Sequence, residues 1–163
     1  MGVSAAYMFV DESTLDRLVS LSPEVLVSTL EELESSGAPT THIEKMWDGL
    51  HFLLTGVSAE APREDDPLSE AVVGVHVFGG DDFVGCTEHD ELPAIIDALD
   101  AVDLRAALDR ADFTTFTDAG IYPNIWADDP AQLRTELADA FAEVRAVHER
   151  AVEAGQHLLI SIY

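Results

Sequence analysis

The residues best suited to chemistry in this sequence lie between positions 44 and 51. On an α-helix Glu44, Asp48 and His51 fall along one edge. A carboxylate one turn from an imidazole can fix its tautomer or raise its pKa, as a general base requires, and two carboxylates with a histidine can hold a divalent metal. The sequence lacks the stronger His-Glu-x-x-His pattern. An alternative therefore remains open. In it Glu44 and Asp48 face water, and His51 packs against Trp47 at the edge of the core.

A second segment, residues 122–126, combines aromatic side chains with a stiff backbone. Pro123 fixes one of its own torsions and restricts Tyr122. Such aromatics can form a platform for a flat ligand or a partner side chain, or they can anchor a long loop onto the core. If Trp47 and Trp126 meet in space, the same residues do both. No catalytic residue is assigned, and the candidate ligand- or partner-binding residues are Trp47, Asp48, His51, Tyr122, Asn124 and Trp126.

Gly49 is unusual because it stands inside a predicted helix. Glycine there costs about 1 kcal/mol relative to alanine, so the missing side chain should bring a compensating gain. Either a strand packs closely against this position, or the space beside Trp47 receives a ligand. Both alternatives remain open.

Other motifs give no support for a cofactor or a metal. Gly79-Gly80 lacks the lysine and spacing of a phosphate loop, and there is no Gly-x-Ser-x-Gly elbow. Cys86 has no basic neighbour to lower its pKa and is expected to be a small buried hydrophobe. We therefore predict no metal and no cofactor. The remaining histidines have no metal-ligand spacing: His42, His76, His89, His148 and His157.

The charge is strongly negative. Asp and Glu number 32 against 8 Lys and Arg, which gives a net charge of −24. Such a surface repels nucleic-acid phosphates and anionic lipid headgroups, so we expect neither partner. Three explanations of the acidity stay open: solvation in a high-salt cytoplasm or a compositional bias, encounter with a basic protein partner, and cation binding.

The cysteine content and the hydropathy of the sequence indicate the cellular compartment of the protein. The single Cys86 cannot form an internal disulfide, which favours a reducing environment. No secretory pattern is visible, and no apolar run approaches the ~18 residues that span a bilayer. We expect a soluble cytoplasmic protein.

Hydrophobic periodicity and capping residues predict one helix-rich α+β domain over residues 1–163, with a small central mixed sheet flanked by helices. The short helix near the N-terminus should turn Leu15, Leu18 and Val19 inward, and the next should turn Val25 inward. Thr41 and Glu44 form a capping-box pattern before the Trp47 helix. Strands are predicted at 6–10, 71–78, 83–86 and 158–162, helices at 15–19, 22–37, 41–56, 87–99, 104–108 and 129–155, and an irregular stretch around 113–126.

The segments Trp-Asp-Gly-Leu-His-Phe-Leu-Leu-Thr-Gly (47–56) and Ile-Tyr-Pro-Asn-Ile-Trp (121–126) resemble the YfbM-like family of bacterial domains. Weaker similarity comes from the N-terminal strand, the Thr87 helix start and Gly155-Gln156 before the last strand. The resemblance implies a compact mixed α/β domain whose sheet is enclosed by helices. It implies no activity or catalytic residue, but it draws attention to Trp47, His51, Tyr122 and Trp126 as a shared site.

The expected function is a non-enzymatic cytoplasmic binding or regulatory domain that acts through protein contacts. One version is an immunity-like inhibitor that covers a basic enzyme surface with its acidic face. The alternative is a small-molecule-binding or hydrolytic domain with a site around His51 and Asp48, walled by Trp47, Tyr122 and Trp126. A third hypothesis is a structural domain whose charge only solvates it.

Overall fold

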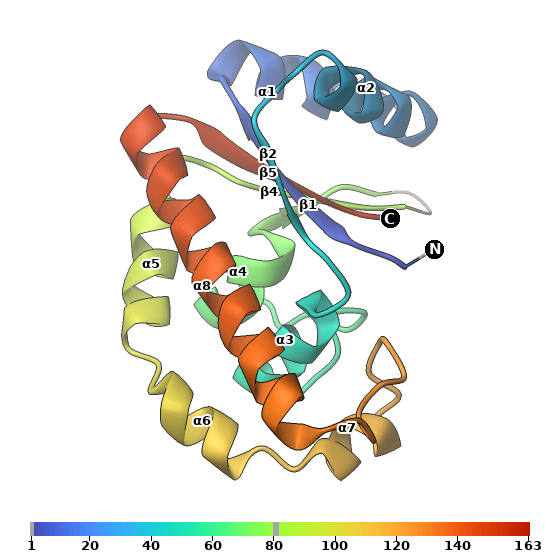
Figure 1. The fold of residues 1–163 in the computed structure, drawn as a ribbon. Helices are drawn as coiled ribbons and strands as arrows, with labels where there is room; N and C mark the ends of the chain where they lie inside the picture. The colour runs from blue at the N-terminus through green and yellow to red at the C-terminus, as the bar shows by residue number, and fades with distance from the viewer. Residues whose placement is uncertain (1, 80–81) are drawn as a thin grey trace.

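The computed structural model describes residues 2–79 and 82–163 and places a five-stranded sheet at the centre (Figure 1). The strand order is β2-β1-β5-β4-β3, and every pairing among the described strands is antiparallel. The α+β class is therefore confirmed, while the sheet is antiparallel and not mixed. The bounds are β1 Ala5–Val10, β2 Thr40–Ile43, β3 His76–Val77, β4 Phe83–Thr87 and β5 His157–Ile162.

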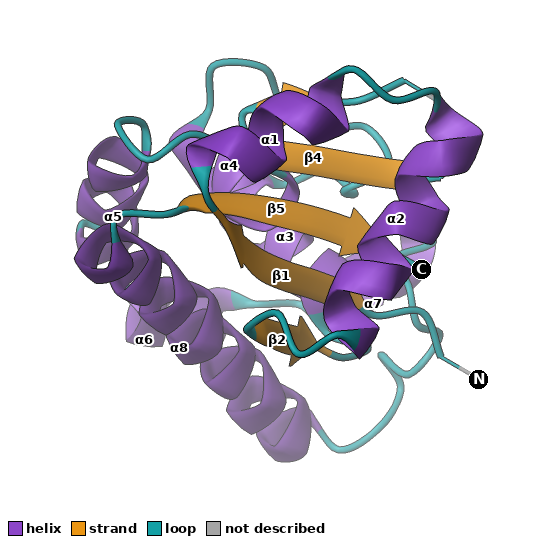
Figure 2. Ribbon diagram, turned by 90° about the horizontal axis from the view of Figure 1, so that it is seen from above, coloured by secondary structure: helices purple, strands orange, loops and turns teal. Residues whose placement is uncertain are grey.

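Helices cover both faces of the sheet (Figures 1 and 2). The N-terminal pair, α1 and α2, covers one face, and the later helices cover the other. Alternating residues of β1 feed the two cores, since Tyr7 joins the larger one and Met8 the smaller one under α2. The bounds are α1 Glu12–Val19, α2 Pro23–Ser35, α3 Trp47–Thr55, α4 Pro67–Val73, α5 Leu92–Asp100, α6 Leu104–Arg110, α7 Phe113–Asp118 and α8 Pro130–Ala154.

Helix α8 forms where its end signals predicted it. The Asp129 carboxylate accepts a hydrogen bond from the Ala131 amide, Pro130 opens the helix, and Gly155 ends it at a left-handed φ of 66°. Its buried stripe packs over α3 and α5. Neither this helix nor another in the described parts of the chain has the length and apolar content to cross a bilayer.

The predicted strand at 71–78 is wrong. Asp66 caps a helix by accepting a hydrogen bond from Leu68, Pro67 occupies its first turn, and Gly74 ends it, so that α4 takes most of the apolar run. The pair His76–Val77 alone joins the sheet, as its exposed edge strand β3. A short apolar run does not distinguish a buried helix from a buried strand.

Two further elements near predicted helix starts also differ. The capping box at Thr41 does not form, because residues 40–43 pair with β1 as strand β2, with Thr41 opposite Tyr7. Helix α3 begins at Trp47 instead. Thr87 ends strand β4, and α5 begins only at Leu92.

The stretch around residue 113 is helical and not irregular. The Asp112 carboxylate accepts a hydrogen bond from Thr114 and so starts α7, a cap that the sequence reading overlooked. On the opposite side of the sheet Val19 and Val25 are exposed by 53% and 47%, so the prediction that they face inward is wrong. Val19 is the last residue of α1 and Val25 lies in the first turn of α2, so both valines stand at helix ends that face each other across the connecting turn and not the sheet.

His148 is a fully buried histidine on α8. Its Nδ1 donates a hydrogen bond to the Val144 carbonyl at 2.7 Å, and its ring lies 6.4 Å from that of Tyr7. Within the described residues no group forms a hydrogen bond with its Nε2. Burial lowers the pKa of His148 to about 4, because the charged imidazole would lose its hydration.

This burial predicts an acid-sensitive fold. The pKa of His148 is lower in the folded protein than in the unfolded chain. The contribution of the neutral, buried imidazole to the free energy of unfolding is therefore complete above about pH 6.5 and is lost as the pH falls towards 4. Between pH 7 and 4.5 the wild type should lose roughly 2–3 kcal/mol more unfolding free energy than His148→Phe, as measured by urea denaturation. Equal pH slopes in both proteins would contradict this assignment, and His42→Phe at an exposed histidine is the control.

Candidate functional site

Asp48 is a buried carboxylate that joins three parts of the chain. It lies in the first turn of α3 and is 2% exposed. Oδ1 accepts hydrogen bonds from the Ala59 amide at 2.8 Å and the Ser58 hydroxyl at 3.0 Å, and Oδ2 accepts one from the Tyr122 amide at 2.9 Å. These charge-assisted bonds offset the loss of hydration. The reading in which Asp48 faces water is therefore wrong, although Glu44 does face water.

His51 is also buried and has partners of its own. Its Nδ1 donates to the Val57 carbonyl at 2.7 Å, and Nε2 accepts from the Ser69 hydroxyl, also at 2.7 Å. Ser69 in turn accepts a hydrogen bond from the Arg63 amide. Burial lowers the pKa of His51, so the imidazole is neutral. With both nitrogens engaged, His51 ties α3 to α4 and the loop between them, and it does not pack against Trp47 as one reading expected.

The rings of Trp47 and Tyr122 stack with centroids 5.6 Å apart. Both are hydrogen-bonded to the N-terminal segment, because the Trp47 indole donates to the Val3 carbonyl and the Val3 amide donates to the Tyr122 hydroxyl. The polar atoms of both rings bind the chain itself, which agrees with the alternative in which the aromatics anchor the loop onto the core.

Trp126 explains the glycine at position 49. Its indole donates to the Ile121 carbonyl at 2.8 Å, and its six-membered ring lies against Gly49, where a β-carbon would overlap the Cη2 and Cζ2 atoms. On its other side the ring packs against Phe113 and Phe116. The space left by the missing side chain therefore receives an indole, and neither a strand nor a ligand.

The two aromatic segments do meet, as a shared site would require, and five residues form what we call the buried joint: Trp47, Asp48, Gly49, Tyr122 and Trp126. The imidazole of His51 is directed to α4 instead, and Asn124 is exposed at the turn. Since the polar atoms of Asp48 and His51 are already bonded within the chain, the geometry assigns these residues to structure. It gives no support to a hydrolytic site built on them.

A groove that the sequence did not predict lies on the opposite face of the sheet, beside α2. Residues 11–35 carry seven acids and one arginine, Arg17. Two adjoining hollows share Val27, Asp82 and Val84 and have about 390 and 630 Å³ of empty space, part of it open to solvent. We call them together the α2 groove. Its apolar wall comprises Met8, Leu26, Val27, Leu30, Phe83, Val84 and Ile162, and its acidic rim comprises Glu24, Glu31, Glu34 and Asp82.

Glu34 fixes one end of this groove. Its carboxylate accepts hydrogen bonds from His42 on β2 and, at 2.8 Å, from the Tyr163 hydroxyl at the C-terminus. Burial and the bond to Glu34 raise the pKa of Tyr163 to about 12, so this phenol stays protonated. Glu24 and Glu31 are exposed and leave their charges on the rim.

Comparison with known proteins agrees with the fold. Residues 1–161 match the family model described as "Domain of unknown function (DUF1877)". Protein YfbM of Escherichia coli K12 is 30% identical over 166 residues, covering 99% of each chain. The crystal structure of this E. coli protein, titled a protein of unknown function, superimposes with a TM-score of 0.84 at 29% identity and covers 98% of this chain and 99% of that one. The chain belongs to the DUF1877 family, which confirms the YfbM-like resemblance.

The buried joint predicts that Asp48→Asn destabilises the protein. An amide nitrogen cannot accept from an amide donor, so one buried N–H would lose its partner and the charge-assisted bonds would weaken. We expect a loss of about 2–3 kcal/mol in unfolding free energy, measured by urea denaturation. Glu44→Gln, an exposed change close by, should stay within about 0.5 kcal/mol. A similarly small effect of Asp48→Asn would refute the role given to this carboxylate.

Gly49→Ala should also destabilise the protein, although alanine favours helices. The added methyl overlaps the Trp126 ring, and overpacking of this kind costs about 1–3 kcal/mol. Trp126→Phe removes the overlapping atoms, so Gly49→Ala should be much less harmful in that background. A double-mutant cycle of thermal or urea unfolding measures this coupling. Additive effects would show that the two residues do not oppose each other.

Proposed function

We propose that the protein is a non-enzymatic cytoplasmic binding domain that contacts a basic protein partner through the α2 groove. The observation that carries the proposal is the combination of an apolar wall with a rim of four carboxylates. Val27, Phe83 and Ile162 are half-buried, so part of the apolar wall is accessible between polar groups, an arrangement that is found at protein interaction sites. Opposite charges on the partner would speed encounter and fix its orientation.

The distribution of basic residues supports this choice of surface. Several of them are paired with acids or carbonyls in the helical layer on the far side of the sheet: Lys45 with Glu136, Arg145 with Asp100, and Arg134 with the Leu108 carbonyl. On the α2 side Arg17 stands against seven acids. The acidic field at the groove is therefore largely uncompensated by its neighbours.

The occupant we propose is a partner segment with an apolar anchor flanked by lysine or arginine. Val27 and Leu30 would contact the anchor, while Glu24 and Glu31 would face the cations. An immunity-like inhibitor of a basic enzyme is one form of this function. In that form the acidic face would cover the basic surface of the enzyme.

A site-specific photocrosslinker tests the proposal. With p-benzoylphenylalanine at position 27, irradiation in host cells should yield a crosslink to a protein of basic pI, and the same label at the exposed position 118 on α7 should not. The captured partner, once purified, should bind Glu24→Lys/Glu31→Lys at least about tenfold more weakly than wild type, because two opposed charges replace two attractions.

The matched control is Asp109→Lys/Asp118→Lys, which changes the net charge equally on the far side of the molecule. It should retain wild-type affinity. No crosslink specific to position 27, or equal weakening in both double variants, would contradict the proposal. Equal weakening would favour general charge attraction or solvation instead.

A further inference from the structure

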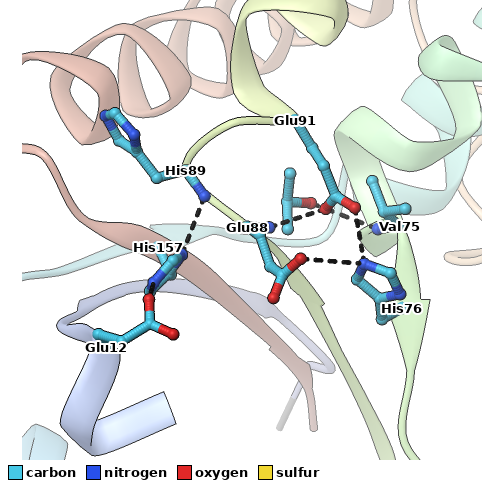
Figure 3. A network of polar contacts seen from close by, with 8 residues as sticks. Glu12, Val75, His76, Glu88, His89, Glu91 and His157 are labelled. Carbon is cyan, nitrogen blue, oxygen red and sulfur yellow. Dashed lines mark hydrogen bonds and ion pairs between the residues drawn. The ribbon is translucent and has the colours of Figure 1, made fainter. Parts of the chain in front are cut away.

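Strand pairing at the β3 edge brings together three side chains that are separated in the sequence. Figure 3 shows His76 with Glu88 and Glu91 around it. The His76 Nε2 atom lies 2.7 Å from Glu91 Oε1 and 3.9 Å from Glu88 Oε2. One ligand atom from each residue lies within 4.8 Å of both others. The three side chains are 53%, 46% and 26% exposed for His76, Glu88 and Glu91, so an ion can reach them.

The backbone holds this cluster in place. His76 pairs with Cys86 across the β3–β4 ladder, and on either side of it the Val75 amide donates to Cys86 and the Phe78 amide donates to Val84. Glu91 Oε2 accepts from the Glu88 amide at 2.8 Å, which leaves Oε1 directed at the imidazole. The positions of His76 and Glu91 are therefore set before an ion arrives, which reduces the entropic cost of binding.

A hollow with about 930 Å³ of empty space, part of it open to solvent, lies on one side of His76. Its charged lining residues are Arg63, Glu64, Asp65 and Glu70, whereas Glu88 and Glu91 do not line it. This space beside the imidazole leaves room for a water ligand on an ion bound at His76.

We propose that His76, Glu88 and Glu91 form a site for a divalent transition-metal ion such as Zn²⁺. In zinc sites histidine nitrogen and carboxylate oxygen lie about 2.0–2.2 Å from the metal, so neighbouring ligands are roughly 3–3.5 Å apart in a tetrahedral shell. The spacing in this cluster brackets that value. A small rotation of the exposed Glu88 side chain closes the longer gap.

The ligand set decides the class of ion. Imidazole favours zinc and related transition metals, whereas calcium and magnesium prefer shells made of oxygen alone. Two carboxylates with a neutral histidine balance the charge of a divalent ion, and three protein ligands leave a position for water. The proposal is independent of the α2 groove.

Calorimetric titration of the metal-free protein with ZnCl₂ at about 0.15 M salt tests the site, since this ionic strength screens diffuse attraction to the acidic surface. One Zn²⁺ should bind per chain. His76→Gln and Glu91→Gln should each weaken it by at least about tenfold, the lower end of the losses seen even for residues that only support a metal ligand. An excess of Ca²⁺ or Mg²⁺ should not displace the zinc.

The matched control is His42→Gln, which removes an exposed histidine that has a single carboxylate partner, Glu34. It should bind zinc as the wild type does. Circular dichroism and metal-free melting should show that all three variants fold. Failure of the wild type to saturate at one ion, or unchanged affinity in His76→Gln, would overturn the site and assign any binding to the acidic surface at large.

Discussion

The buried carboxylate of Asp48 is the constraint from which much of this fold follows. A charge removed from water requires several donors, and the chain supplies them from residues 58, 59 and 122. Meeting that requirement holds the loop after α3 and the distant segment at residue 122 against the start of α3. With its amide bonded to Asp48, Tyr122 stacks its ring on that of Trp47. The residues that follow Tyr122 place the Trp126 indole against Gly49.

In this arrangement the buried polar residues have structural roles, and the proposed binding sites lie on the surface. The polar side chains that look reactive in the sequence, Asp48 and His51, use their hydrogen-bonding atoms to join helices and loops. Interaction chemistry remains available on the exterior. One face carries the acidic α2 groove, and the exposed edge strand β3 carries His76 with its two glutamates.

Local signals predicted the parts of the fold that depend on local physics. The terminal strands, the Phe83 strand, the 104–108 helix and α8 were predicted from alternation, caps and glycine stops, and all are present. Residues 71–78 and 41–46 were assigned wrongly, because a short apolar run or a capping pattern does not reveal which segment will pair with the sheet. The sequence placed Trp47 and Tyr122 in one candidate site, and their rings do lie together. The burial of Asp48 was not, since its donors come from up to 74 residues away. The His76 cluster depends likewise on the β3–β4 register.

Amide hydrogen exchange at Ala59 and Tyr122 tests the central role of Asp48 most directly. If the buried carboxylate holds both segments, these two amides should exchange only through global unfolding, with a free energy equal to that of the whole domain. Exchange at the rate of exposed loop amides, such as that of Asn124, would show that the two segments open independently and that Asp48 does not hold the fold together.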